Sequence, residues 1–216
     1  DEGEDEEISY MKMLRERHID GFIITPSGSK INKKSNEYLL ELKKDNLPFV
    51  MIGHRLEDST IDMVTVGTEE GAYEAVRHLI RLGHQRIGLL AGPISKGMSR
   101  GRLRGYRKAL TDHNLKMDKD LIVEGDLRQE SGYRQMKQLL EIKNPPSGIF
   151  AVNDMVAIGA MKAIEEKKLK TPEDIAVVGF DDIPLASIIK PSLTTVAQPK
   201  YEIGRTAIEV LINKIE

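Results

Sequence analysis

The feature that most constrains the fold of this chain is a regular alternation of strand-like and helix-like segments. Short runs rich in β-branched residues alternate with longer segments whose apolar residues recur every three to four positions. Alternation of this kind, with short connections, specifies parallel sheets covered by helices and therefore an α/β fold. Strands are expected at residues 20–26, 48–53, 63–67, 86–93, 121–125, 148–152 and 175–180, and helices at 10–17, 36–45, 69–82, 100–114, 129–140, 154–168 and 202–215.

Seven strands are many for one sheet in 216 residues, but they are natural for two sheets of similar build. The Gly- and Ser-rich residues 92–101 and the proline-bounded extended residues 191–199 are the expected junctions. We therefore expect an N-terminal lobe of residues 1–93, rejoined by 197–216, and a C-terminal lobe of residues 94–196. A cleft between two lobes is a preferred place for a small ligand.

Composition excludes several classes of partner. The 32 basic and 34 acidic residues give a net charge of -2, so this part of the protein is not expected to touch nucleic acid itself. The absence of Cys excludes disulfides and thiolate metal sites and fits a reducing cytoplasm. No apolar run approaches the length of about 20 residues that spans a bilayer, and no signal peptide opens the chain, so no membrane partner is expected.

The usual signatures of enzymes and metal sites are absent from the sequence. The five histidines form no i, i+4 pair and no HExxH motif, so no zinc site is expected. No GxSxG elbow, Walker loop or complete GxGxxG is present. A phosphoryl-accepting aspartate in "GFDD" lacks a companion Lys and hydroxyl at obvious strand ends. We therefore expect no catalytic residue, metal or cofactor.

Polar side chains gather where the expected strands end, which is where ligands bind in open α/β sheets. "FAVND" ends one strand, "VVGFDD" ends the next, and "SRGRLRGY" lies beside the first expected junction. Amide, carboxylate and guanidinium groups are the set that a hydroxyl-rich ligand needs. The side chains concerned are Asn153, Asp154, Asp181, Asp182, Arg100, Arg102 and Arg104.

Each of these side chains also has a structural explanation. For Asp154, which stands where a helix starts, capping that helix is favoured over contact with a ligand. For Asn153, contact with a ligand is favoured over capping. One carboxylate of the Asp181–Asp182 pair could cap the next helix while the other is solvated. Among the arginines, only the location of Arg102 favours a role in binding.

Five segments carry a resemblance to a known family: "EEGAYEAVRHLIRLGHQRIGLLAGP", "RLRGYRKAL", "FAVNDMVAIGAMKAI", "TPEDIAVVGFDDIPLA" and "PSLTTVAQP". In this order and spacing the chain resembles the effector-binding core of the lactose-repressor (LacI/GalR) family of bacterial transcription regulators. The resemblance implies two lobes like those of type I periplasmic binding proteins, a sugar or other small effector between them, and homodimers that bind a palindromic operator. An exported sugar-binding protein of a transporter shares the fold and is the alternative.

The resemblance also assigns site residues. It implies that Arg102, Asn153 and Asp181 contact the effector, while Asp154 and Asp182 have structural roles near the site, with Asp182 anchoring the loop or capping the helix. Leu127 stands where the family often has an aromatic residue that stacks on the ligand, and an aliphatic side chain does not favour face-on stacking against a pyranose ring. "IGHR" and "VTVGTEEGA" depart from the family's commoner motifs, so the resemblance assigns no ligand contact to the first lobe.

Members of the family begin with a helix-turn-helix head, a hinge and a strand-helix-strand unit, and they continue with further strands after the helix at 202–215, so the resemblance implies a chain truncated at both ends. The resemblance therefore implies an incomplete first lobe and a DNA-binding head outside this chain. "DGFIITPSGSK" and "PFVMIGHR" favour regulators of oligosaccharide or maltose-type genes. The residues upstream would discriminate between a regulator and an exported sugar-binding protein, because a helix-turn-helix indicates a regulator and a signal peptide indicates a transporter protein.

Overall fold

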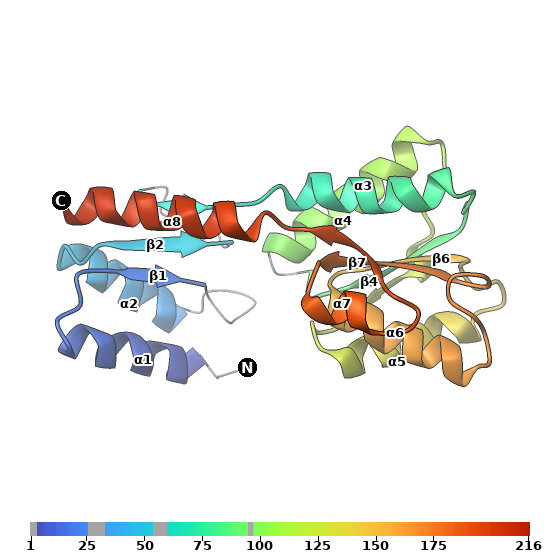
Figure 1. Cartoon of the computed structure of the whole chain (residues 1–216), viewed down its shortest axis with the longest axis horizontal. Helices are drawn as coiled ribbons and strands as arrows, with labels where there is room; N and C mark the ends of the chain where they lie inside the picture. Colours follow the sequence, from blue (N-terminus) through green and yellow to red (C-terminus); the bar gives the residue numbers. More distant parts are fainter. Residues whose placement is uncertain (1–3, 26–32, 54–59, 95–96) are drawn as a thin grey trace. The chain divides into compact units, whose positions relative to one another are not determined.

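The computed structural model describes residues 4–25, 33–53, 60–94 and 97–216 (Figure 1). The chain forms two compact units. The first unit consists of Asp1–Val66 and Pro199–Glu216, and the second unit consists of Gly67–Gln198. The chain therefore passes from one unit to the other after Val66 and returns after Gln198.

The first unit contains a three-stranded parallel sheet with the order β1-β2-β3. Apolar side chains of the two helices α1 and α2, among them Met11 and Leu39, pack on one face of this sheet. Ala207 and Leu211 of α8 pack on Val50 at the other face (Figure 1). The bounds are α1 (Glu4–Glu16), β1 (Phe22–Ile24), α2 (Lys33–Lys44), β2 (Phe49–Ile52), β3 (Met63–Val64) and α8 (Lys200–Ile215).

The second unit contains a five-stranded parallel sheet with the order β5-β4-β6-β7-β8. Two helices, α3 and α4, cover one face, and α5 and α6 cover the other (Figure 1). The bounds are α3 (Thr68–Arg81), β4 (Ile87–Ala91), α4 (Gly97–Asp112), a 3-10 turn at Lys119–Leu121, β5 (Ile122–Glu124), α5 (Gln129–Glu141), β6 (Gly148–Ala151), α6 (Asp154–Glu166), β7 (Ala176–Asp181), α7 (Pro184–Ile188) and β8 (Thr194–Ala197).

The core of the second unit follows from the two-residue period of its strands. Ile149 and Val177 point to the α5–α6 face, whereas their neighbours Phe150 and Val178 point to the α3–α4 face. All four side chains are buried, because a parallel sheet has helices on both faces. This explains why the strands appear in the sequence as continuous apolar runs.

The structure confirms all seven predicted strands but corrects the domain boundaries. The predicted first lobe ended at residue 93, yet α3 and β4 belong to the second unit because β4 pairs with both β5 and β6. Of the Gly- and Ser-rich residues 92–101, residues 92–94 follow β4 and residues 97–101 form the start of α4, all within the second unit, and residues 95–96 lie outside the described residues. The second predicted boundary, at residues 196–197, lies two residues before the observed one.

Candidate functional site

The carboxyl edge of the second unit's sheet is the candidate site. The strand order reverses between β4 and β6, and the carboxyl ends of two such strands flank the position where α/β proteins bind ligands. Hydrogen bonds join the predicted residues at this edge in two groups. Arg102 bonds to Asp181, and Asn153 bonds to the loop that contains Leu127.

Arg102 of α4 and Asp181 at the end of β7 form a largely buried ion pair. Arg102 Nη2 donates to Asp181 Oδ1 over 3.0 Å, and the guanidinium carbon lies 4.0 Å from the centroid of the Phe180 ring. The Arg102 residue is only 4% exposed, whereas the side chain of Asp181 is 29% exposed. Burial lowers the pKa of the Arg102 guanidinium, and the Asp181 carboxylate opposes this shift, so the group stays charged.

The backbone at Asp181 is held in an unusual conformation. Asp181 and Asp182 have φ angles of 111° and 52°, a region that non-glycine residues rarely adopt. The carboxylate of Asp154 supports this turn, since it accepts hydrogen bonds from the Ile183 N–H over 2.8 Å and from the Thr195 hydroxyl. Asp154 is 1% exposed, so these bonds compensate the burial of its charge.

The capping roles differ from those predicted. The cap of α6 is Asn153, whose Oδ1 accepts from the Val156 N–H over 2.8 Å, and not Asp154. The Asn153 Nδ2 donates to the carbonyl of Leu127 over 3.0 Å. The oxygen and the nitrogen of the Asn153 amide are therefore each hydrogen-bonded to a backbone group. Asp182 does not cap α7, because Ile183 occupies that position.

The other candidates occupy different surroundings. Leu127 is half-buried and packs against the apolar core on the α5–α6 face. Arg104 pairs with Glu69 over 2.6 Å on the exposed side of α4, and Arg100 is exposed. Among these arginines, only Arg102 is buried against the carboxyl edge.

Two residues of the site escaped the sequence analysis, and both come from the segment predicted as a junction. Gln198 follows β8 directly, and its Nε2 donates to Asp181 Oδ1. Thr195, within β8, donates to Asp154 and accepts a long hydrogen bond of 3.4 Å from the Asp182 N–H. The signal that could have found them is "TTVAQP" itself, because a polar residue directly after a parallel strand lies at the ligand-binding edge.

The arrangement of these groups can bind a ligand that carries hydroxyl groups. The edge offers a carboxylate, a guanidinium and amides, which together can accept from and donate to hydroxyl groups. Among the described residues, no group of three or more His, Asp or Glu side chains could hold a metal ion. No helix in this described part of the chain is long and apolar enough to cross a membrane.

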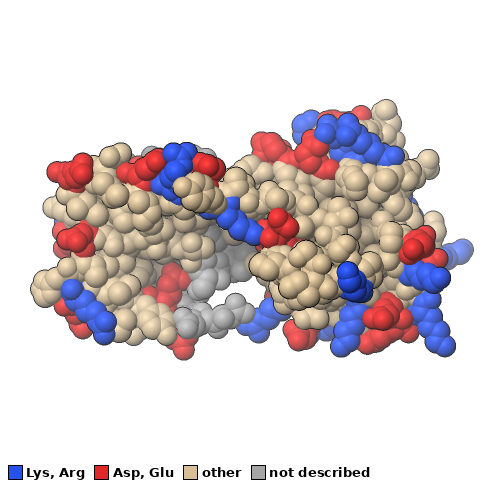
Figure 2. All heavy atoms as spheres, in the orientation of Figure 1, with Lys and Arg blue, Asp and Glu red and all other residues tan. Residues whose placement is uncertain are grey.

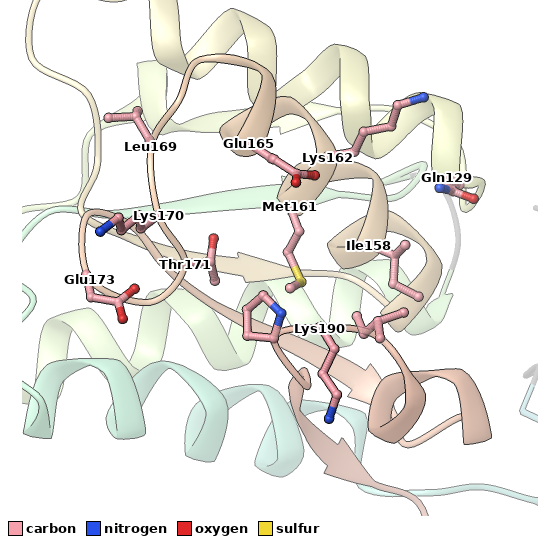
Figure 3. Close-up of a pocket in the computed structure, with 12 residues that line it drawn as sticks. Gln129, Ile158, Met161, Lys162, Glu165, Leu169, Lys170, Thr171, Glu173 and Lys190 are labelled. Carbon is pink, nitrogen blue, oxygen red and sulfur yellow. The ribbon is translucent and has the colours of Figure 1, made fainter.

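A pocket of about 440 Å³ lies elsewhere on the second unit, along the outer side of α6 (Figure 3). Met161 of α6 points into it, and the loops before β7 and before β8 complete its wall. Its lining consists of Gln129, Ile158, Met161, Lys162, Glu165, Leu169, Lys170, Thr171, Glu173, Ile189, Lys190 and Pro191. These residues include none of the predicted effector contacts, so this pocket is distinct from the candidate site.

Comparison with known proteins gives a consistent result. Residues 76–216 match the family of periplasmic binding protein-like domains. The HTH-type transcriptional repressor PurR of Aliivibrio salmonicida (strain LFI1238) is 35% identical over 214 residues, which cover 98% of this chain and 62% of that protein. The chain thus spans about three fifths of the length of the curated relatives that it matches.

Two solved structures of LacI-family regulators are similar in both sequence and fold. A regulatory protein from Chloroflexus aggregans is 34% identical with a TM-score of 0.83, over 95% of this chain and 72% of that one. A transcriptional regulator from Enterococcus faecium with bound ribose is 32% identical with a TM-score of 0.83, over 97% of this chain and 76% of that one. The chain therefore belongs to the LacI/GalR family and contains its periplasmic-binding-protein-like, effector-binding core.

Proposed function

We propose that this chain is the effector-sensing part of a bacterial transcription repressor, and that its effector is a sugar bound at the carboxyl edge of the second unit's sheet. The observation that carries the proposal is the buried Arg102–Asp181 pair, whose carboxylate is partly exposed at the end of β7. An ionised carboxylate accepts from two neighbouring sugar hydroxyls, and a guanidinium donates to ring or hydroxyl oxygens. The bound ribose in the similar regulator from Enterococcus faecium supports a sugar as the class of ligand.

The remaining predicted residues fit different roles in this proposal. Leu127 supplies an apolar wall that a sugar contacts edge-on rather than through face-to-face stacking. Asn153 holds the Leu127 carbonyl and acts on the ligand mainly by fixing that loop. Asp154 supports the turn that presents Asp181.

The relatives favour a regulator over the alternative, an exported sugar-binding protein of a transporter, because the curated protein reported above is a repressor. In this proposal the regulator acts in the cytoplasm and catalyses no reaction. We place the DNA contact in a helix-turn-helix head outside this chain. On the face shown in Figure 2, acidic and basic side chains are interspersed on both units, which does not resemble the basic surface of a DNA-binding domain.

We also propose that the protein forms a homodimer through the face of the second unit that carries α6 and α7. Ile188 of α7 is 67% exposed and Leu185 is 39% exposed, which is unusual for apolar residues so close together. The adjoining pocket along α6 is lined by Ile158, Met161 and Ile189 (Figure 3). In a two-fold dimer each partner buries the same patch, so one such face per chain is sufficient.

Calorimetric titration of the full-length protein with ribose, maltose, cellobiose and glucose tests the proposed effector. We expect saturable binding of at least one of these sugars and a change in the retention of an operator fragment when that sugar is present. Binding of none of them, with a folded protein, would contradict a sugar effector. A signal peptide in place of a helix-turn-helix in the upstream coding sequence would favour the transporter protein instead.

A further inference from the structure

The pocket along the outer side of α6 has the size and the lining of a small-molecule site (Figure 3). Its volume of about 440 Å³ lies within the range of about 300 to 1,000 Å³ that ligand pockets span. Apolar side chains from α6 and from the loops beside it form much of its wall, namely Ile158, Met161, Leu169, Ile189 and Pro191. An apolar wall with a few polar groups is the usual composition of a pocket that binds a small organic molecule.

One polar atom at this pocket has no hydrogen-bond partner. Thr171 lines the pocket, and its Oγ1 is buried without a partner in the described part of the chain. In Figure 3 the side chains of Thr171 and Met161 approach the middle of the pocket from two sides. Because a buried hydroxyl without a partner is unfavourable, a polar group that enters the pocket would be stabilised beside Thr171.

Charged side chains of both signs surround the apolar wall. They are Lys162, Glu165, Lys170, Glu173 and Lys190. Within the residues that the structure describes, none of these five side chains forms an ion pair. The ammonium group of Lys162 lies 5.7 Å from the centroid of the Tyr133 ring, and those of Lys170 and Lys190 point away from the middle of the pocket (Figure 3). Carboxylates and flexible ammonium groups are therefore both available to a ligand.

This lining matches a zwitterion with an apolar body. A ligand with a single charge would be attracted by one set of these side chains and repelled by the other. An α-amino acid carries its ammonium and its carboxylate on the same carbon, so Glu165 can accept from the ammonium while Lys170 or Lys190 donates to the carboxylate. An apolar side chain of the amino acid can then pack on Met161 and Ile189.

We propose that this pocket binds an α-amino acid with an apolar side chain, and that Glu165 and Thr171 are among its ligand contacts. The site is separate from the sugar site at the carboxyl edge of the sheet, and the inference goes beyond the proposed function without resting on it. The lining residues of the pocket all belong to one chain, although several of them border the face proposed for the dimer.

Calorimetric titration of the full-length protein with L-leucine and L-phenylalanine tests the inference. We expect saturable binding of at least one of them at millimolar concentration. Two further probes keep the side chain of leucine but only one of its charges, since isoamylamine lacks the carboxylate and isocaproate lacks the ammonium. Each should bind roughly tenfold more weakly than leucine, because one charge-assisted hydrogen bond is lost.

Variants locate the binding in this pocket. Glu165→Gln should weaken binding of the amino acid roughly tenfold, since the partner of the ammonium loses its charge. Thr171→Val removes one neutral hydrogen bond and should weaken binding roughly three- to tenfold. Glu141→Gln, which changes an exposed glutamate of α5 outside the pocket, is the matched control and should bind like the parent.

Circular dichroism melts verify that each variant is folded, and Thr171→Ala replaces Thr171→Val if the latter does not fold. Binding of neither amino acid by the folded parent would overturn the inference. Binding of isocaproate or isoamylamine as tightly as leucine would show a site for a single charge and not for a zwitterion. If both Glu165→Gln and Thr171→Val bind like the parent, the amino acid binds elsewhere. Binding by Ile188→Asp but not by the parent would show that a second copy, and not a small molecule, occupies the pocket.

Discussion

At the scale of single residues, the adjacent aspartates at the end of β7 have different environments and should respond differently to the same change. Asp181 is hydrogen-bonded to Arg102 and Gln198, whereas Asp182 is exposed. Asp181→Asn removes the charge that strengthens a bond to sugar hydroxyls, a bond worth about 1.5 to 3 kcal/mol, so affinity should fall roughly tenfold to a hundredfold. Asp182→Asn should leave affinity unchanged.

The pair of variants is matched, because Asn tolerates positive φ angles about as well as Asp and both positions have them. Calorimetric titration with the sugar that the parent binds measures the two affinities. Equal affinities for Asp181→Asn and the parent would show that the Asp181 charge serves the fold and not the ligand.

His84 predicts a pH dependence of stability at the opposite edge of the same sheet. Its Nδ1 lies 2.9 Å from Ser147 Oγ, and burial lowers the pKa of its imidazole. His84 therefore takes up a proton more readily in the unfolded chain than in the folded one. The contribution of neutral His84 to the free energy of unfolding is full above the ordinary His pKa of about 6.5 and is lost as the pH falls below it. In urea unfolding, His84→Gln should lose less stability than the parent between neutral and acidic pH, and an equal loss would contradict this.

At the scale of elements, the sequence predicted the helices and strands whose apolar residues follow a regular pattern. The buried strands are continuous apolar runs, and α3 shows its face through Ala72, Val76 and Leu79 before Gly83 ends it with a φ of 94°. The strand β8 was predicted only as an extended junction, because its residues are mostly exposed or half-buried and prolines stand at both sides. The five-residue helix α7 is too short to show a helical period.

The same limits explain the site. Asp181 could be placed from the sequence because it follows a recognisable apolar strand, and Arg102 because it lies near the start of a recognisable helix. The cap of α6 was assigned to Asp154 although Asn153 provides it, since adjacent residues at a helix start cannot be distinguished by pattern alone. Gln198 was missed with the strand that precedes it.

Packing of α5 against α6 gives a prediction at this scale. A Cβ on Gly159 would collide with the carbonyl of Gln129, so Gly159→Ala must push the two helices apart. Overpacking costs typically about 1 to 3 kcal/mol of unfolding free energy. Gly204→Ala in α8 is the control, since nothing lies within 4 Å of its Cβ position and it should stabilise the helix by about 0.5 to 1 kcal/mol. Urea unfolding of both variants measures the difference, and equal effects would contradict close packing at Gly159.

At the scale of the whole molecule, the two units differ in how completely their sheets are covered. The central strands β6 and β7 have helices on both faces, whereas Ile23 of β1 in the first unit is 37% exposed. Amide hydrogens exchange most slowly where burial and packing make opening costly. In this chain, residues 175–178 should therefore exchange more slowly than residues 22–24 and 50–52 in a hydrogen-exchange experiment. Equal or slower exchange in the first unit would show that its sheet is the better protected one.

The exposed apolar face of α6 and α7 leads to the last prediction, which concerns assembly. Full-length protein at micromolar concentration should sediment as a dimer without ligand. Burying the exposed apolar surface around Ile188 between two copies lowers the free energy of that surface relative to its exposure to water. Ile188→Asp places a charge on this apolar face and should shift the protein toward monomer. Leu82→Asp is the matched control, since Leu82 is 61% exposed at the end of α3, away from this face, and its replacement should leave the dimer intact. A monomeric parent would show that the proposed dimer does not form. An Ile188→Asp variant that sediments as a dimeric parent does would show that the interface lies elsewhere on the molecule.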